Sequence, residues 1–289
     1  MNKQLSIIVP AYNEEGAIAQ TIEGLKQELN KLDLDYEIIV VNDGSTDKTK
    51  EILERTQEIK VIHHPENRGY GASLKTGFKQ SQNGLTLITD ADGTYPNESI
   101  PDLIKHTSDY DMVVGARTGK KAKIPLIRKP AKWIMGKLAN YLSGMKIPDI
   151  NSGLRIMKKS LIEKYLYILP DGFSFTTTIT LAALTNGYRV KYVPITYSKR
   201  TGKSKFRPIR DTLNFFQLII RTILYFNPLK VFVPLSLIFF FLAIVVFLWS
   251  YFFTPKVMDV TTAIFLLSSI QVLSIGMLAD LITKIHKRN

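Results

Sequence analysis

The sequence contains no cysteine among its 289 residues and only four histidines. The absence of cysteine excludes disulfide bonds, thiolate metal sites and cysteine nucleophiles. Four scattered histidines also argue against a zinc site, because such sites are built mainly from cysteine and histidine. Any metal ion that this chain binds is therefore expected to be held by oxygen atoms.

Charged residues are nearly absent from residues 231–282. Only three occur there, whereas the first 230 residues contain 34 of the 38 basic and 23 of the 25 acidic residues. Two apolar runs, 231–253 and 260–282, would each form a helix about 34 Å long, enough to cross a hydrocarbon core of about 30 Å. Neither run has a polar face, which disfavours a buried pair of helices in a water-soluble core. We therefore expect two membrane spans.

Basic residues lie outside both spans, with Lys230 before the first and KIHKRN (284–289) after the second. By the positive-inside bias, the N-terminal part and the C-terminus are expected on the cytoplasmic side of a cell membrane. The N-terminal MNKQLSIIVP has too short an apolar stretch for a signal peptide, so we expect no export of this part.

Residues 5–117 alternate between strand-like and helix-like runs with short connections. The expected strands are 5–12, 36–43, 60–64, 85–92 and 111–117, and the expected helices are 14–31, 46–57, 70–82 and 98–107. Apolar strands that alternate with helices indicate an α/β fold with a mostly parallel sheet covered on both faces. Ligands of such sheets bind beyond the carboxyl ends of the strands.

Three of these strands end in polar residues, namely YNEE (12–15), NDGS (42–45) and DAD (90–92). Paired carboxylates at a strand end suit a hard divalent cation that also binds phosphate oxygens, as in a nucleoside diphosphate. An arbitrary D-x-D is more often a helix cap or a surface feature. The D-x-D tripeptides at 33–35 and 109–111 do not end a strand and are interpreted as solvated surface, so only 90–92 is expected to meet a ligand.

Two basic segments without acidic residues follow. Residues 112–148 contain nine Lys or Arg among apolar residues, and residues 172–210 end in KRTGKSKFRPIR. Such segments can lie in the headgroup plane of a membrane. The expected domains are residues 1–205, a juxtamembrane amphipathic helix at 206–228 and a two-helix transmembrane anchor at 229–289.

Seven motifs occur in order along the chain: PAYNEE (10–15), VVNDGSTD (40–47), NRGYGASLKTGF (67–78), DADGTYP (90–96), VVGAR (113–117), DINSGLR (149–155) and KRTGKSK (199–205). Together they resemble family-2 glycosyltransferases of the GT-A fold, specifically the polyprenyl-phosphate branch exemplified by dolichyl-phosphate mannosyltransferases. The C-terminal spans resemble those of bacterial members. The resemblance implies transfer of a hexose from a UDP- or GDP-sugar to undecaprenyl or dolichyl phosphate, with Mg²⁺ or Mn²⁺ as cofactor.

The resemblance also implies roles for individual residues. Those implied to hold the nucleoside are Pro10, Tyr12, Glu14 and Asp43. Asp90 is implied to lie near the ribose and diphosphate and, with Asp92, to bind the metal ion. The residues implied to handle the phosphates of donor and acceptor are Arg117, Arg128, Arg200, Ser204 and Lys205. Asp149 would either orient a phosphate-binding arginine or cap the turn DINSG, and the sequence does not choose between these roles.

The sequence departs from the family pattern at three positions. Asn42 replaces the first residue of an Asp-Asp pair, Thr94 stands where the dolichyl mannosyltransferases have Gln, and Thr178 stands where many relatives have Glu. The reaction class is unaffected, but the identity of the sugar stays open.

A lipid phosphate is largely dianionic at neutral pH, so it needs no general base. The protein would supply charge screening and alignment for one in-line displacement with inversion. Two alternatives stay open: a processive polysaccharide synthase, whose Gln-x-x-Arg-Trp motif this chain lacks, and a non-catalytic membrane-anchored protein that binds nucleotide sugars. Nucleic-acid binding is disfavoured because no recognition module is present, and a homo-oligomer is left open.

Overall fold

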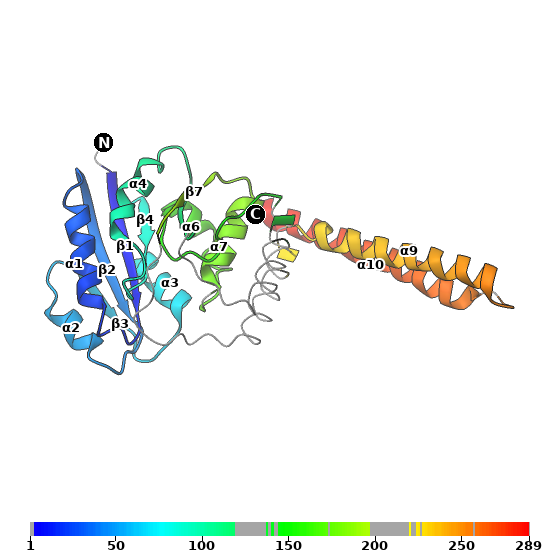
Figure 1. The fold of residues 1–289 in the computed structure, drawn as a ribbon, viewed down its shortest axis with the longest axis horizontal. Coiled ribbons are helices and arrows are strands. Elements are labelled where there is room, and N and C mark those ends of the chain that lie inside the picture. The colour runs from blue at the N-terminus through cyan, green and yellow to red at the C-terminus, as the bar shows by residue number, and fades with distance from the viewer. Residues whose placement is uncertain are drawn as a thin grey trace. The chain divides into compact units, whose positions relative to one another are not determined.

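The structure, a computed structural model, describes residues 3–118, 144–172, 174–196, 227–256 and 258–288, with residues 137, 140, 141, 220, 224 and 225. The chain divides into two compact units, Met1–Phe215 and Phe216–Asn289. Figure 1 shows a sheet with its helices in the first unit and a long pair of helices in the second.

The described part of the first unit contains one seven-stranded sheet. Its strands are β1 (Lys3–Ala11), β2 (Leu34–Asn42), β3 (Lys60–His63), β4 (Leu85–Ile88), β5 (Met112–Ala116), β6 (Arg155–Lys158) and β7 (Val190–Pro194), in the spatial order β3-β2-β1-β4-β6-β5-β7. Neighbouring strands are parallel except at β6, which runs antiparallel to both β4 and β5. The predicted mostly parallel α/β sheet is confirmed.

Helices cover both faces of this sheet. They are α1 (Ile18–Leu29), α2 (Thr49–Arg55), α3 (Tyr70–Gln80), the 3₁₀ turn η1 (Asn97–Ser99), α4 (Ile100–Lys105), α6 (Lys159–Tyr165) and α7 (Phe175–Thr185). Because strand side chains alternate between faces, Ile7 and Val9 of β1 join a core with α1, α2 and α4, whereas Ile8 points toward α3. A Cβ at Gly77 of α3 would collide with the Ile8 side chain, so the glycine lets α3 lie directly on the sheet.

Several predicted boundaries were wrong. The strand predicted for 85–92 ends at Ile88, where its ladder with β1 also ends, so Asp90 and Asp92 lie in the following loop. The strands β6 and β7 were not predicted. In β6 the reason is visible, because this strand has only four residues, with Arg155 and Lys158 at its ends.

Asp111 was also interpreted wrongly as solvated surface. Its carboxylate accepts hydrogen bonds from Lys158 Nζ at 2.8 Å and from the backbone N–H of Arg189 at 2.9 Å. It therefore joins the start of β5 to the end of β6 and to the residue before β7. Asp33 and Asp35 are exposed, as predicted.

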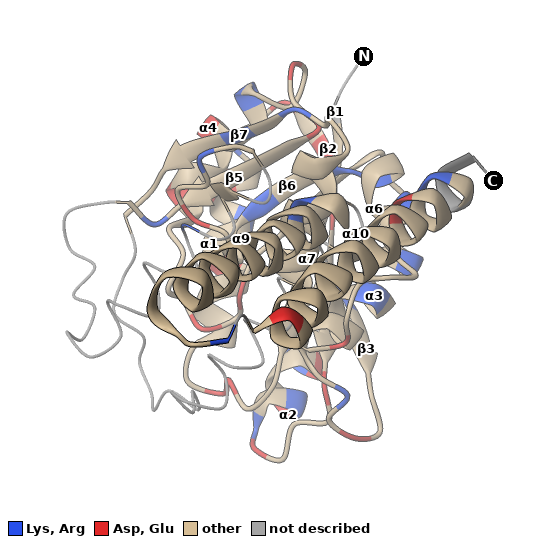
Figure 2. Ribbon diagram, turned by 90° about the vertical axis from the view of Figure 1, so that its right-hand side faces the viewer, with Lys and Arg blue, Asp and Glu red and all other residues tan. Residues whose placement is uncertain are grey.

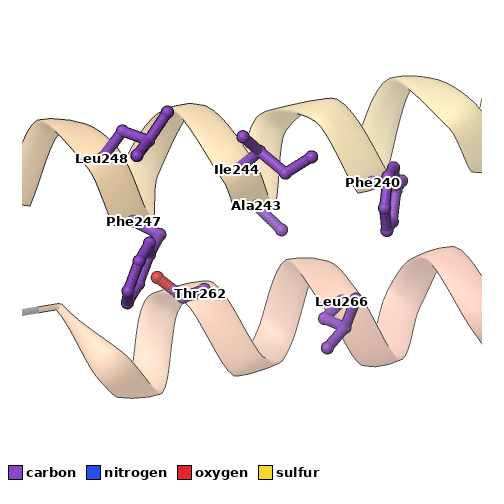
Figure 3. A pocket seen from close by; sticks show the side chains of 7 residues that line it. All are labelled: Phe240, Ala243, Ile244, Phe247, Leu248, Thr262 and Leu266. Atoms are coloured by element: carbon purple, nitrogen blue, oxygen red, sulfur yellow. The ribbon is translucent and has the colours of Figure 1, made fainter.

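The second unit contains α9 (Leu229–Phe253) and α10 (Asp259–Arg288), which pack against each other. The Ser236 hydroxyl of α9 donates to the Ser269 carbonyl of α10 at 2.9 Å. Both helices are long and apolar enough to cross a membrane, and Figure 2 shows few charges along them. An apolar groove of about 210 Å³ lies between them (Figure 3).

Candidate active site

The candidate site lies at one edge of the sheet. The parallel strands β1, β2, β4 and β5 all end there, so the predicted polar segments 12–15, 42–45 and 90–92 gather at that edge. Because β6 is antiparallel, its beginning lies at the same edge, and the segment 149–154 that precedes it joins the site.

Asp90 is surrounded by groups from three segments. The Tyr70 hydroxyl at the start of α3 donates to Asp90 Oδ1 at 3.0 Å. Gly153 lies so close that an added Cβ would be 2.7 Å from the same oxygen, and the Gly153 N–H donates to the Tyr95 hydroxyl at 2.6 Å. Burial, and then the negative charge of Asp90, raises the pKa of both Tyr70 and Tyr95. Both phenols therefore stay neutral and position Asp90 by hydrogen bonding and packing.

Asp92 is oriented by Thr94, one of the three residues at which this chain departs from the family pattern. The Thr94 hydroxyl donates to Asp92 Oδ1 at 2.6 Å, and the Thr94 N–H reaches the same oxygen at 3.2 Å. The Thr21 hydroxyl of α1 donates to the Ala91 carbonyl at 3.1 Å, which ties the loop between the two carboxylates to α1. Thr94 thus fixes the direction of a carboxylate.

The carboxylates fit a divalent cation that arrives with a nucleotide. Among the described residues, no group of three or more His, Cys, Asp or Glu could hold a metal ion. Mg²⁺, however, is usually bound by one or two protein carboxylates together with substrate phosphates. Asp90 and Asp92 supply two carboxylates on one loop, and oxygen donors suit Mg²⁺ or Mn²⁺.

Asp149 and Arg117 form a bidentate ion pair. Arg117 Nε donates to Asp149 Oδ2 at 2.7 Å and Nη2 donates to Oδ1 at 2.9 Å, while the Arg117 backbone N–H adds a bond of 3.0 Å. Oδ1 also accepts the N–H of Asn151 at 3.2 Å. Asp149 therefore both orients Arg117 and caps the turn DINSG, while the contact of Arg117 with a phosphate stays a prediction.

Replacing Asp149 by Asn is expected to lower the stability of the first unit at neutral pH by about 2 kcal/mol, because a charged hydrogen-bonding partner of Arg117 is lost. Burial opposes the charged form of Asp149, but hydrogen bonds and the charge of Arg117 outweigh it and hold the pKa below its usual value. A lowered carboxylate pKa contributes stability that is complete above the unfolded-state pKa of about 3.9 and is lost as the pH falls through the folded-state pKa.

Thermal unfolding of wild type and Asp149→Asn between pH 7 and pH 3 checks this. The difference between the two proteins should persist down to about pH 4 and shrink below it. The exposed Asp33→Asn should match wild type throughout. A difference that grows toward low pH would contradict the prediction.

Asp43 is buried, and its carboxylate binds the segment that precedes α3. It accepts the backbone N–H groups of Arg68 at 3.0 Å and Gly69 at 2.8 Å. His64 Nδ1 lies 2.7 Å from Asp43 Oδ1, and its Nε2 lies 2.9 Å from the Thr76 hydroxyl. These contacts hold residues 64–69 at the end of β2; the implied contact with a nucleoside stays a prediction.

The other predicted residues are distributed as follows. Pro10 is buried within β1, and Tyr12 and Glu14 are half-buried in the following loop. That loop is tied to the one after β2, since the Asn13 N–H donates to Ser45 Oγ at 3.0 Å and the Glu14 N–H donates to Thr49 Oγ1 at 2.9 Å. The predicted residues outside the described part of the chain are Arg128, Arg200, Ser204 and Lys205.

The two remaining departures from the family pattern have structural roles. Asn42 is buried, with its Nδ2 3.0 Å from His63 Nδ1, and its Oδ1 accepts the Ser45 N–H at 3.2 Å. The Thr178 hydroxyl donates to the Ser174 carbonyl within the buried helix α7. Both side chains are therefore satisfied by the protein itself.

Arg155 is the site residue that the sequence did not reveal. Its side chain is 0% exposed, although arginine is almost never fully buried unless it is paired with an acid. It donates to the carbonyls of Ser152 and Thr176 and to Thr180 Oγ1, and no carboxylate accepts from it within the described chain. Arg155 therefore fixes the position of the turn in which Gly153 lies close to Asp90.

Replacing Arg155 by Met is expected to cost about 3 kcal/mol of stability, because buried carbonyl oxygens lose their donor. Thermal unfolding measures this loss. Arg189→Met is the matched control, because the Arg189 side chain is exposed and the hydrogen bonds of this residue to other described residues use its backbone. Equal stability of the two variants would contradict the stabilising role of the Arg155 side chain.

Comparison with known families identifies both units. The model of glycosyl transferase family 2 matches residues 6–166, and the model of the GtrB C-terminal hairpin matches residues 227–285. The first covers the sheet from β1 to β6 and the candidate site. The second covers α9 and most of α10.

Named relatives are similar over most of this chain. The low-salt glycan biosynthesis hexosyltransferase Agl6 of Haloferax volcanii is 30% identical over 213 residues, which are 72% of this chain but 51% of Agl6. The chain thus spans about half the length of that relative. The dolichyl-phosphate hexose transferase of Haloferax volcanii is 30% identical over 71% of this chain and 87% of its own. An undecaprenyl-phosphate 4-deoxy-4-formamido-L-arabinose transferase of Pseudomonas fluorescens is 29% identical over 74% of this chain and 64% of that transferase.

Solved structures share the fold at low sequence identity. Glucosyl-3-phosphoglycerate synthase of Mycobacterium tuberculosis superposes with a TM-score of 0.59 at 18% identity, over 77% of this chain and 78% of that one. TarS of S. aureus superposes with a TM-score of 0.54 at 23% identity, over 76% of this chain and 66% of the TarS chain. These likenesses confirm the GT-A fold that the motifs predicted. With a family match that covers more than half of its residues, the chain belongs to glycosyl transferase family 2.

Proposed function

We propose that this protein transfers a hexose from a nucleoside diphosphate sugar to a polyprenyl phosphate, with inversion at the anomeric carbon. The observation that carries the proposal is the gathering of Asp90, Asp92 and the Arg117–Asp149 pair at the carboxyl edge of a family-2 sheet. Relatives whose names specify dolichyl phosphate and undecaprenyl phosphate support the acceptor class.

In the proposed reaction an oxygen of the lipid phosphate forms a bond to the anomeric carbon, while the bond from that carbon to the nucleoside diphosphate breaks. The dianionic nucleophile has no proton to lose, so no residue is needed as a general base. Arg117, held in direction by Asp149, would screen the repulsion between the two anionic reactants. A divalent cation held by Asp92 and Asp90 would, when bound, neutralise charge on the departing diphosphate.

The metal and donor proposals draw on structural neighbours. The mycobacterial synthase has been solved with Mn²⁺ and UDP, and TarS with UDP-GlcNAc. We propose Mg²⁺ or Mn²⁺ and a UDP- or GDP-sugar for this chain. Pro10, Tyr12, Glu14 and Asp43 remain the proposed nucleoside residues, and the proposed phosphate residues outside the described chain are Arg128, Arg200, Ser204 and Lys205.

We also propose that α9 and α10 insert as two membrane spans, with residues 1–205 as the catalytic domain and 229–289 as the anchor. The predicted juxtamembrane helix, 206–228, lies largely outside the described residues and stays a prediction. The basic residues outside the hairpin favour a cytoplasmic catalytic domain and C-terminus. Because the chain has no cysteine, single cysteines placed at Ser108, which is exposed in the first unit, and at Thr254, between α9 and α10, can be labelled with a membrane-impermeant maleimide in intact cells. Only the cysteine at position 254 should react.

The activity test uses purified full-length protein, Mg²⁺ or Mn²⁺, a polyprenyl phosphate and a panel of UDP- and GDP-sugars. Mass spectrometry should detect the lipid with one added hexose. A ladder of longer products would favour a processive synthase instead. Failure to form a product with any donor, while nucleotide still binds, would favour a non-catalytic binding protein.

A further inference from the structure

Gln271 is a polar residue at the middle of α10. The apolar span of this helix covers Asp259–Ile285, so Gln271 lies about 18 Å from one end and about 21 Å from the other at 1.5 Å per residue. A hydrocarbon core extends only about 15 Å to either side of its midplane. The side-chain amide of Gln271 is therefore placed near the bilayer centre, where neither water nor headgroups can satisfy it.

The hairpin itself does not satisfy this amide. Gln271 is exposed, and its side-chain amide makes no hydrogen bond to any other residue that the structure describes. In contrast, the Ser269 and Ser274 hydroxyls, one on either side of it, interact within the hairpin: Ser269 with Ser236, and Ser274 with the Ile270 carbonyl. An amide with no partner in hydrocarbon is costly, so a further partner is expected.

Helix geometry places Gln271 on the side of α10 that faces away from α9. Ser269 and Gly276 are buried against α9, and a Cβ at Gly276 would collide with Phe232. At 3.6 residues per turn, these two positions lie about 140–160° around the helix from Gln271. α9 therefore cannot supply the missing hydrogen bonds.

The residues around Gln271 form an exposed seam with coiled-coil spacing. Ile264, Leu267, Leu278 and Leu281 are all more than half exposed. With Gln271 and Ser274 they follow the a and d positions of a heptad repeat, and Gln271 takes a central a position. A single polar residue at an a position in such a seam sets the register between two helices.

We propose that α10 pairs with α10 of a second copy of this chain through this seam, with the two Gln271 amides hydrogen-bonded to each other. An amide is self-complementary, because its NH₂ group donates and its carbonyl oxygen accepts. Copies inserted with the same topology are parallel, so a two-fold axis along the membrane normal brings each seam residue opposite its own copy. The proposal rests on the membrane insertion of the hairpin proposed above.

Cysteine cross-linking in native membranes tests this pairing. The wild-type chain has no cysteine, so each disulfide between two copies must come from the introduced cysteine. Full-length variants Leu267→Cys, Gln271→Cys and Leu278→Cys are treated with copper phenanthroline and run on a non-reducing gel. Each should give a dimer band that a thiol reductant removes. The matched controls are Leu266→Cys, beside the groove of Figure 3, and Met277→Cys, which is 59% exposed and about 120° around the helix from Gln271.

The pairing is supported if the three seam variants cross-link and the two controls do not. Equal cross-linking at all five positions would indicate random collision and overturn the pairing. The pairing is also overturned if no variant cross-links although the protein stays in the membrane after extraction with alkaline carbonate. Release of the protein by carbonate would instead contradict membrane insertion, and the pairing with it. Sugar transfer is assayed separately, so a failure of the pairing stays distinct from a failure of the proposed activity.

The strength of self-association provides an independent measurement. Gln271→Leu should raise the dimer dissociation constant in detergent about tenfold, because the interhelical hydrogen bonds are lost. Gln271→Asn, which keeps the amide, should stay close to wild type, and so should the control Met277→Leu. Tighter association of Gln271→Leu would contradict the role of the amide.

Discussion

Replacing Asp92 by Asn is expected to lower kcat/KM at least about 100-fold, because stabilisation of the departing diphosphate by a divalent cation contributes several kcal/mol to the transition state. Asparagine has the shape of aspartate and can still accept the hydrogen bond of Thr94, which in the wild type is 2.6 Å long. The substitution therefore removes a charge and leaves the loop in place. The measurement is steady-state sugar transfer at saturating Mg²⁺ or Mn²⁺.

Asp35→Asn is the matched control for this prediction. Asp33 and Asp35 form the same D-x-D tripeptide, but both side chains are exposed. This variant should keep wild-type kcat/KM. A calorimetric titration of Mn²⁺ with nucleotide should show weaker binding to Asp92→Asn and unchanged binding to Asp35→Asn. Activity of Asp92→Asn within a factor of about three of wild type would refute the role given to Asp92, since that is far below the expected loss.

Replacing Gly153 by Ala is expected to reduce activity about 100-fold, because a displacement of about 1 Å at a reacting centre can have that effect. The added methyl group would lie 2.7 Å and 2.9 Å from the two oxygens of Asp90. The turn cannot retreat easily. The Gly153 N–H is bound to Tyr95, the Ser152 hydroxyl donates to the Gly115 carbonyl at 2.5 Å, and Arg155 binds the Ser152 carbonyl. The carboxylate of Asp90 must therefore move.

Gly84→Ala is the control, because a Cβ at that position would meet no atom within 4 Å. Both variants should unfold near the wild-type temperature, and only Gly153→Ala should lose activity. Transfer is followed at varied nucleotide-sugar concentration, which separates weaker donor binding from slower chemistry. Full activity of Gly153→Ala, or an equal loss in Gly84→Ala, would show that the position of Asp90 is not critical.

The local part of the fold could be predicted because it depends on short-range pattern. The apolar runs of β1, β2 and β5 and the spacing of apolar residues in α1 and α3 follow from side-chain periodicity alone. The two long apolar helices follow from length and hydropathy. The D-x-D at 90–92 was distinguishable from the pairs at 33–35 and 109–111 because it follows a buried strand, although the strand itself stops at Ile88.

The antiparallel strand β6 could not be predicted, because its place depends on contacts between residues far apart in the chain. It pairs with β4, some 70 residues earlier, and with β5, some 40 residues earlier, and these pairings bring the segment 149–154 to the site. Arg155 is a second example. Arginine side chains usually lie at the surface, and this one can be buried because the carbonyl oxygens of Ser152 and Thr176 and the hydroxyl of Thr180 accept its hydrogen bonds.

By itself, the sequence determined the class of chemistry at the sheet edge, the absence of thiol chemistry and the two apolar spans, since each depends on residue type and local spacing. The tertiary structure alone decided that Asp149 holds Arg117, that Gly153 abuts Asp90, and that Gln271 faces away from α9. These three facts are geometric. They arise when strands and helices that are remote in sequence pack together, and local residue preferences carry no information about that packing.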